Sequence, residues 1–121
     1  MSEDKKQVYI VDDDISVRRA LSVMLATYGF TVNTFASADQ FFRAVPNSVS
    51  GCLILDIHMP GLDGWEALGR IIKSGSKRRV IIISADKDSV NYEKSIEAGA
   101  VGYLQKPFDA NALVGFINGA L

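Results

Sequence analysis

The chain of 121 residues is poor in the residue types that stabilise small secreted proteins. It contains one cysteine, Cys52, and three prolines. A single cysteine excludes an internal disulfide, and because Cys52 lies within an apolar run we expect a small buried side chain. A lone thiol without a secretory signal is typical of the reducing cytosol, so the sequence predicts a cytoplasmic protein.

Long hydrophobic runs and an excess of charge of one sign are also missing. No run approaches the ~18 apolar residues of a membrane-spanning helix, so we expect no membrane partner. The 13 basic and 14 acidic residues give a net charge of −1. This balance argues against direct binding of nucleic acid, which usually requires a basic face. Basic residues cluster only in Lys73–Arg79, which we interpret as a solvated helix end and loop.

Short apolar runs alternate with longer amphipathic segments. Strands that are apolar on both faces belong inside a sheet covered by helices on each side. Alternating strand–helix units make such a sheet parallel, with right-handed crossovers. The sequence therefore predicts an α/β protein: a single three-layer, doubly wound domain whose five-stranded parallel sheet has the order 2-1-3-4-5, with five helices. The predicted strands are Val8–Val11, Thr31–Phe35, Gly51–Leu55, Val80–Ile83 and Gly102–Gln105.

Capping residues mark the predicted helices. In Ile15–Tyr28 apolar residues recur at helical spacing, with Ile15 and Tyr28 on the apolar face and Arg18 off it. Capping boxes begin at Ser37 and Asp63. The later helices are expected at Ser89–Ala98, with Val90, Tyr92 and Ile96 turned inward, and after Asp109.

Polar residues follow four of the predicted strands. Asp12 and Asp13 follow the first strand, Asp56 the third, Ser84 the fourth and Lys106 the fifth. Ligands of doubly wound sheets bind beyond the carboxyl ends of the strands, where the strand order reverses. With the predicted order, these side chains would be lateral neighbours at one edge of the sheet.

The chemistry of this edge suits a divalent metal and a phosphoryl group. Two carboxylates at ~4 Å and an effective dielectric of ~20 repel by about 4 kcal/mol, and a divalent cation removes that repulsion. Mg²⁺ prefers oxygen ligands and keeps some of its waters. A carboxylate flanked by a metal, a hydroxyl and an ammonium can act as a nucleophile toward phosphorus. Asp14, the third acid of its triplet, is more simply explained as a helix N-cap.

At these positions the chain resembles bacterial response-regulator receiver domains, and the resemblance covers essentially the whole chain. It implies a flavodoxin-like fold, with residues 1–121 forming one receiver domain and the output domain absent from this chain. It also implies a signalling domain and not an enzyme, one that catalyses only its own phosphorylation and dephosphorylation. The matching segments are Val11–Asp14, Asp56–Gly64, Ser84-Ala85, Ala98–Ala100, Gly102-Tyr103 and Lys106–Phe108.

The resemblance assigns chemical roles to the residues at the edge. Asp56 would take a phosphoryl group from the phosphohistidine of a sensor histidine kinase or a histidine phosphotransfer protein. Asp12 and Asp13, together with Asp56 and the backbone carbonyl of His58, would bind Mg²⁺ or Mn²⁺. Lys106 would pair with the phosphate.

The resemblance also implies a switch. The Ser84 hydroxyl would move toward the phosphoryl group, and Tyr103 would follow it inward. This motion would reshape the face made by the helix at Ser89–Ala98, the next strand and the last helix, which recruits a second receiver or an output domain. The bond before Pro107 is expected to be cis. The segment Phe35–Phe42 is similar to receivers of transcription regulators.

Three other interpretations remain open at this stage. A haloacid-dehalogenase-type phosphatase would use Asp12 as the nucleophile of an Asp12-x-Asp14-x-Ser16 pattern, but it needs an acidic pair after the lysine, where only Asp109 follows Lys106. A flavodoxin-like cofactor binder needs a first loop that accepts phosphate, whereas the acidic triplet repels it. A degenerate receiver would serve only for docking, yet every catalytic position is filled.

Overall fold

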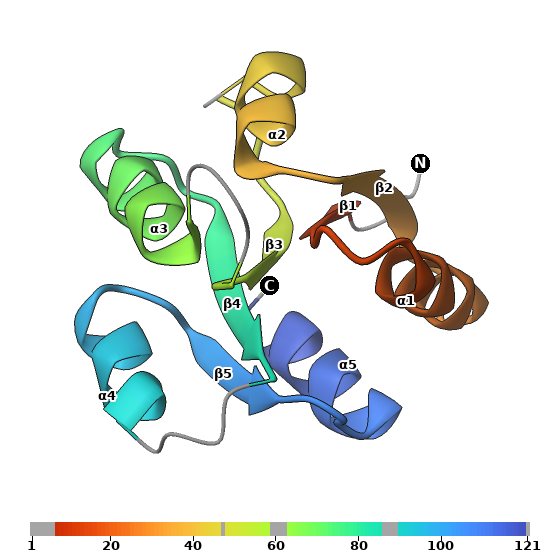
Figure 1. Ribbon diagram of the computed structural model, residues 1–121. Coiled ribbons are helices and arrows are strands. Elements are labelled where there is room, and N and C mark those ends of the chain that lie inside the picture. The colour runs from red at the N-terminus through yellow and green to blue at the C-terminus, as the bar shows by residue number, and fades with distance from the viewer. Residues whose placement is uncertain (1–6, 47, 59–62, 86–89, 121) are drawn as a thin grey trace.

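The computed structural model describes residues 7–46, 48–58, 63–85 and 90–120 (Figure 1). Within these residues, strands and helices alternate along the chain, and the five strands form one parallel sheet in the order β2-β1-β3-β4-β5. The predicted fold class and strand order are therefore confirmed. The elements are β1 Gln7–Val11, α1 Ile15–Thr27, β2 Thr31–Phe35, α2 Ala38–Ala44, β3 Cys52–Asp56, α3 Gly64–Lys73, β4 Arg79–Ser84, α4 Val90–Glu97, β5 Gly102–Gln105 and α5 Ala110–Ala120.

The register of the sheet brings the predicted polar residues to one edge. β1 and β3 pair up to their ends, so Asp12, the residue after β1, lies beside Asp56, the last residue of β3. β4 ends at Ser84, which pairs with Gln105, and Lys106 follows directly. The carboxyl ends of four strands thus converge, as expected for a doubly wound sheet.

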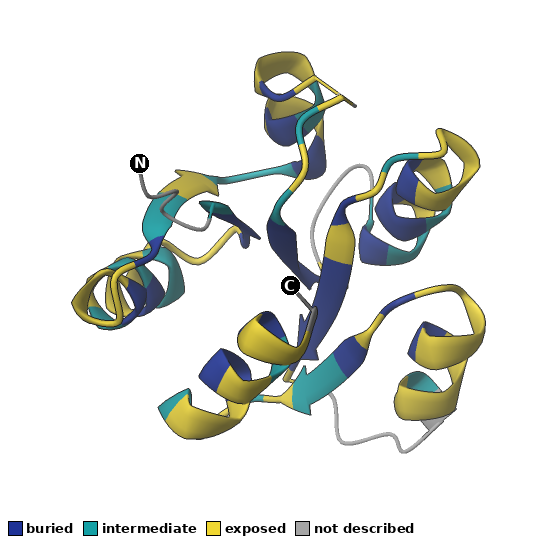
Figure 2. Cartoon of the chain, turned by 180° about the vertical axis from the view of Figure 1, so that it is seen from behind, coloured by how far each residue is buried: buried dark blue, intermediate teal, exposed yellow. Residues whose placement is uncertain are grey.

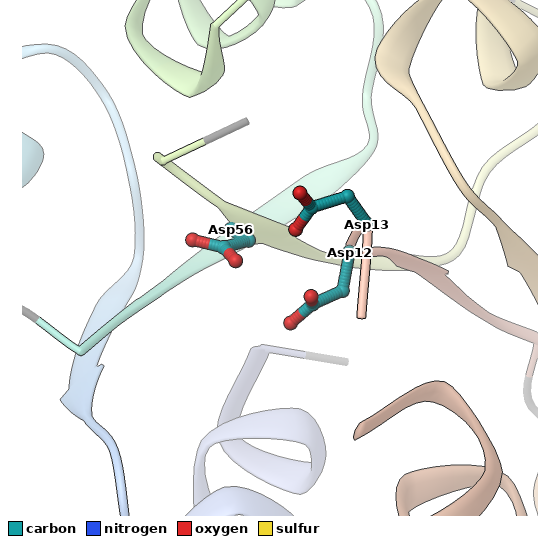
Figure 3. A group of neighbouring side chains, drawn as sticks. All are labelled: Asp12, Asp13 and Asp56. Atoms are coloured by element: carbon teal, nitrogen blue, oxygen red, sulfur yellow. The ribbon is translucent and has the colours of Figure 1, made fainter. Parts of the chain in front are cut away.

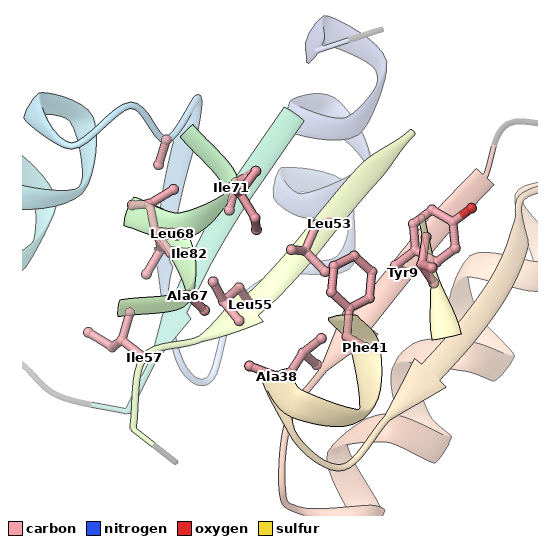
Figure 4. Packing of buried hydrophobic residues seen from close by; sticks show 14 residues of the cluster. Tyr9, Ala38, Phe41, Leu53, Leu55, Ile57, Ala67, Leu68, Ile71 and Ile82 are labelled. Atoms are coloured by element: carbon pink, nitrogen blue, oxygen red, sulfur yellow. The ribbon is translucent and has the colours of Figure 1, made fainter. Parts of the chain in front are cut away.

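Each face of the sheet carries its own hydrophobic cluster. α2 and α3 cover one face, where the Phe41 ring lies edge-on to Tyr9 with the centroids 5.7 Å apart (Figure 4). α1 and α5 cover the other face, with Leu25 and Ile117 fully buried against the strands. All residues of β3 are buried (Figure 2), so the central strand is shielded from water on both faces.

The starts of the first three helices match the sequence prediction. The side chains of Asp14, Ser37 and Asp63 cap α1, α2 and α3, each accepting a backbone N–H of the first turn at 2.8 to 3.1 Å. Such caps satisfy N–H groups that have no partner within the helix. Asp14 is therefore a structural cap, as the sequence indicated.

The inward face of α1 differs from the prediction. Leu21 and Leu25 are buried, but Ile15 and Tyr28, which were expected on the same face, are 51% and 47% exposed. Val17 packs against the cluster instead. Val17, Leu21 and Leu25 form a row with four-residue spacing, and this row meets the sheet. Several apolar rows exist on α1, so helical spacing alone did not identify the buried one.

The prediction for α4 is wrong for two of its three inward residues. Tyr92 and Ile96 are 54% and 41% exposed, whereas the predicted start Ser89 and the Val90 side chain lie outside the described residues. Ser95 is fully buried, and its hydroxyl donates to the carbonyl of the preceding turn at 2.7 Å. That internal hydrogen bond lets a polar side chain face the protein interior.

Two ring contacts connect α4 to its neighbours. The Lys94 ammonium lies 4.4 Å from the centroid of the Trp65 ring on α3. Tyr92 meets Tyr103 of β5 edge to face, with centroids 6.4 Å apart and planes at 82°. These contacts link α4 to α3 on one side and to β5 on the other.

Arg78 contradicts the interpretation of Lys73–Arg79 as a solvated segment. It is 3% exposed, and its Nη2 atom donates to the carbonyls of Pro46 at 2.7 Å and Val49 at 3.0 Å. Its guanidinium lies 4.8 Å from the centroid of the Phe41 ring, and burial lowers its pKa. Arg78 therefore ties the segment after α2 to the start of β4, at the opposite edge of the sheet from Asp56.

None of the helices among the described residues combines the length and the apolar character of a membrane-spanning segment.

Candidate functional site

Three carboxylates converge at the carboxyl edge of the sheet (Figure 3). Asp12 and Asp13 follow β1, and Asp56 ends β3. One oxygen from each carboxylate can be chosen so that all lie within 4.8 Å of one another. Asp12 and Asp56 are 0% and 4% exposed, whereas Asp13 faces solvent. The cluster thus has two buried members and one open side.

Lys106 supplies a positive charge within the cluster. Its Nζ atom donates to Asp12 Oδ2 at 2.8 Å and to Asp56 Oδ2 at 3.1 Å. The backbone N–H of Lys106 donates to the Ser84 carbonyl at 2.7 Å, which joins the ends of β4 and β5. The following bond to Pro107 is cis, as the family resemblance implied. Lys106, which lies 94 residues after Asp12 and 50 after Asp56, thereby offsets the repulsion between these two buried acids.

Asp12 is held by hydrogen bonds on its side chain and on its backbone. Its Oδ1 atom accepts the N–H of Asp14 at 2.9 Å, and Lys106 binds the other oxygen. Its own N–H donates to the Phe35 carbonyl at 3.2 Å. Its carbonyl accepts a hydrogen bond from Arg18 Nη1 at 2.7 Å.

Sequence reasoning missed Arg18, which was placed off the apolar face of its helix. Helical side chains lean toward the N-terminus of their helix. A long cationic side chain one turn into α1 therefore reaches back to the segment that precedes the helix. A search of the first turn of α1 for long polar side chains that can lean back toward Asp12 and Asp13 could have identified Arg18.

Asp56 is an acid that its surroundings disfavour in the charged form. Burial raises its pKa and nearby Asp12 adds to this effect, against the lowering by the His58 N–H and by Lys106. That N–H donates to Asp56 Oδ1 at 2.9 Å. Burial alone would lower the pKa of Lys106, but its contacts with Asp12 and Asp56 outweigh burial and raise it. Any interaction that disperses the charge of the ionised Asp56 carboxylate therefore stabilises it.

The start of α3 packs directly on the backbone beside Asp56. A Cβ atom on Gly64 would lie 2.3 Å from Ile57 Cα and 2.7 Å from the Asp56 carbonyl oxygen. The Gly64 N–H also donates to the Ile57 carbonyl at 3.2 Å. Only glycine permits this approach. Residues 59–62 of the matching segment lie outside the described residues.

The other predicted site residues lie on β4, on β5 and just after β3. Ser84 is fully buried at the end of β4. Tyr103 is half-buried on β5 and packs against the hydrophobic cluster on the sheet face that α2 and α3 cover. The backbone of His58 contacts Asp56, while its side chain is exposed. Their roles in metal binding and switching stay predictions.

The donor set fits a divalent cation of the magnesium type. All three clustered side chains offer carboxylate oxygens, which are the ligands that Mg²⁺ prefers. Asp13 is exposed, so a cation bound there would have access to water. An acidic cluster of this kind is typical of the magnesium site of receiver domains.

Comparison with known protein families settles what kind of domain this is. The profile of the response regulator receiver domain matches residues 8–118. The chain belongs to this family. Receiver domains are phosphoacceptor signalling modules of two-component systems and not enzymes in the usual sense, and they work with a cognate histidine kinase. The phosphatase and cofactor-binding interpretations therefore have no support.

Curated relatives place this receiver among regulatory proteins. It is 39% identical to the response regulator protein TodT of Pseudomonas putida over 121 residues, which cover 100% of this chain and 53% of TodT. It is 35% identical to the transcriptional regulatory protein FixJ of Bradyrhizobium diazoefficiens over 117 residues, which cover 97% of this chain and 57% of FixJ. The chain thus spans about half the length of these relatives.

Solved structures agree with this assignment. The response regulator StyR superposes with a TM-score of 0.89 and 36% identity, over 98% of this chain and 60% of StyR. The structure of FixJ-N gives a TM-score of 0.88 and 31% identity, over 98% of this chain and 94% of that one. The likeness to FixJ-N covers nearly the whole of both chains, which supports the receiver fold for the full segment.

Proposed function

We propose that this receiver takes a phosphoryl group onto Asp56 from the phosphohistidine of a sensor histidine kinase or a histidine phosphotransfer protein. The observation that carries the proposal is the position of Asp56. It is a buried acid at the carboxyl edge of the sheet, 3.1 Å from the Lys106 ammonium, with two further carboxylates clustered around it. Burial raises the pKa of Asp56 because it destabilises the ionised carboxylate. The ionised carboxylate is the form that would make the bond to phosphorus.

The transfer needs a nucleophile, charge neutralisation and a leaving group. An Asp56 oxygen forms the new O–P bond while the N–P bond of the phosphohistidine breaks. The electron pair of that bond passes to the imidazole nitrogen, which takes up a proton. Lys106 would donate to a phosphoryl oxygen, and its contacts with both Asp12 and Asp56 support this role.

Asp12, Asp13 and Asp56 are the proposed ligands of Mg²⁺ or Mn²⁺, with the carbonyl of His58 as a further ligand. The clustering of the carboxylate oxygens supports this assignment. The bound cation would neutralise the carboxylates and spread the charge of the phosphoryl oxygens. The protein groups supply the binding geometry, and Lys106 adds a fixed cation beside it.

The proposed output of phosphorylation is a change in partner binding through the face of α4, β5 and α5. Ser84 and Tyr103 are the proposed switch residues. The contact of Tyr103 with the exposed Tyr92 of α4 supports a link from β5 to that face. The relatives TodT and FixJ are regulators about twice as long as this chain, which supports a role in transcription control through an output domain or a second receiver.

Labelling by acetyl phosphate tests the phosphoacceptor. The wild type with Mg²⁺ should gain one phosphoryl group that base and hydroxylamine remove, located on Asp56 by mass spectrometry, and Asp56→Asn should gain none. Asp14→Asn is the matched control, because asparagine also caps helices well and the substitution removes a neighbouring charge. Label on Asp12 would favour the phosphatase chemistry, and an unlabelled wild type would indicate a docking module.

Metal dependence of thermal stability tests the cation site. A cation at a hundred times its Kd stabilises a protein by about 2.7 kcal/mol, so Mg²⁺ should raise the Tm of the wild type by several degrees. Asp13→Ala should show a smaller increase. Equal shifts in the two proteins, measured by calorimetry, would refute the role of Asp13.

A further inference from the structure

We infer that Arg18 is a positioning residue for the cation site. Its guanidinium holds the peptide that joins Asp12 to Asp13 and thereby directs the Asp13 carboxylate toward Asp56. The inference rests on the proposed function, because it concerns the cation that these acids are proposed to bind.

Arg18 contacts the peptide group that directly precedes Asp13. The carbonyl that accepts the hydrogen bond at 2.7 Å belongs to Asp12, so it is the oxygen of the Asp12–Asp13 peptide. The preceding N–H of Asp12 is bound to Phe35 at 3.2 Å. The backbone is therefore held from β2 on one side and from α1 on the other. Its plane determines the direction in which the next side chain leaves the chain.

Asp13 depends on this support more than its neighbours do. The Asp12 side chain is buried and is bound by Asp14 and Lys106, and the Asp56 side chain is buried and bound by His58 and Lys106. Asp13 is exposed, yet its carboxylate extends toward Asp56 in the cluster (Figure 3). An exposed ligand gains its orientation mainly from the backbone that carries it, and Arg18 holds that backbone.

Charge alone does not explain the presence of Arg18 here. A cation beside the acid cluster repels a bound metal ion, and a cation near the start of a helix is not favoured by the helix dipole. Simple electrostatics therefore predicts that removing Arg18 tightens metal binding. The positioning role predicts the opposite sign. Arg19 is exposed and carries the same charge one residue further along α1, so it provides the matched control.

The test is a calorimetric titration of the whole chain with Mg²⁺ and with Mn²⁺ at fixed ionic strength. Residues that hold metal ligands in place typically contribute tenfold or more to metal affinity, so Arg18→Ala should raise the Kd by about tenfold. Arg19→Ala should leave the Kd unchanged or lower it slightly. Arg18→Lys, which restores a donor and the charge, should recover part of the affinity. In the metal-free state, amide exchange at Asp13 and Asp14 should become faster in Arg18→Ala and stay unchanged in Arg19→Ala.

The outcomes separate this inference from the proposed function. If the wild type binds neither ion, the proposed cation site fails and the inference fails with it. If the wild type binds and Arg18→Ala binds as tightly or more tightly, the inference alone is wrong. If Arg18→Ala does not fold, as judged by circular dichroism, Arg18→Lys and Arg18→Met replace it, and a Kd equal to that of the wild type in both would overturn the inference.

Discussion

Asp56 carries a charge at a place where folding disfavours one. It is 4% exposed, and burial raises its pKa. The folded protein therefore holds the Asp56 proton more tightly than the unfolded chain does. This tighter proton binding contributes to the free energy of unfolding. The contribution is fully present below the pKa of Asp56 in the unfolded chain, and it is lost as the pH rises through the pKa of Asp56 in the folded protein. Above that range of pH, the ionised phosphoacceptor lowers the free energy of unfolding.

Replacing Asp56 should consequently stabilise the metal-free protein. Asparagine keeps the oxygen that accepts the His58 N–H but removes the buried charge. We expect Asp56→Asn to raise the Tm by about 2–5 °C at pH 7 in the presence of a chelator, and the gain should shrink toward acid pH as the wild-type carboxyl takes up its proton. Asp39→Asn, on the exposed face of α2, should bring no such gain. A pH-independent difference between Asp56→Asn and the wild type, measured by calorimetry, would contradict this account.

Residue identity also explains which site residues the sequence could predict. Asp12, Asp56 and Lys106 directly follow or end apolar strands, so their convergence follows from a parallel sheet. Arg18 and Arg78 lie outside that pattern. Arg18 reaches back six residues to the Asp12 carbonyl, a contact that only the lean of helical side chains could have indicated. Arg78 binds the carbonyl of Pro46, 32 residues away, and that contact depends on three-dimensional proximity that no local pattern encodes.

At the scale of elements, the position of α3 depends on one glycine. Gly64→Ala would press a methyl group into the Asp56–Ile57 backbone, and we expect it to lower the free energy of unfolding by about 2–3 kcal/mol and to slow labelling of Asp56. Gly69 lies within the same helix, and a Cβ atom added there would meet no other atom within 4 Å. Gly69→Ala should therefore stabilise α3 by up to about 1 kcal/mol.

Urea unfolding of both variants, together with acetyl phosphate labelling, checks this pair. The same substitution in the same helix then differs only in what the added methyl group meets. If Gly64→Ala were as stable and as readily labelled as Gly69→Ala, the close packing of α3 on the end of β3 would matter neither for stability nor for phosphorylation of Asp56.

The elements also show where pattern reading stops. The strands and the helix caps were predicted because alternation, glycines and capping residues are local signals. The rotation of α1 and α4 was not, since Tyr28 and Tyr92 are apolar enough to suit either face. Packing against neighbours chose the Val17–Leu21–Leu25 row of α1 and the Ser95 side of α4.

At the scale of the whole molecule, β3 lies at the centre of two hydrophobic clusters. Cys52, its first residue, is fully buried, and burial raises the pKa of its thiol to about 12. At pH 8 only about one thiol in ten thousand is then ionised, and thiolates are the reactive form. Reaching Cys52 requires separation of the helices from the sheet.

Cys52 should therefore report global unfolding. A disulfide reagent at pH 8 should leave the native protein unmodified over minutes and react at once in concentrated urea. In intermediate urea the reaction rate should follow the unfolded fraction measured by circular dichroism. Rapid reaction in native buffer would show that this part of the sheet opens independently of global unfolding.

The contact between Lys94 and Trp65 has a practical consequence in spectroscopy. Trp65 is the only tryptophan of the chain, and it lies at the second residue of α3, directly after Gly64 and under a cation from α4. Indole emission responds to nearby charge and to solvent. The intrinsic fluorescence of this protein is therefore a label-free reporter of the spacing between α3 and α4, read one residue after the glycine that packs on the backbone of Asp56.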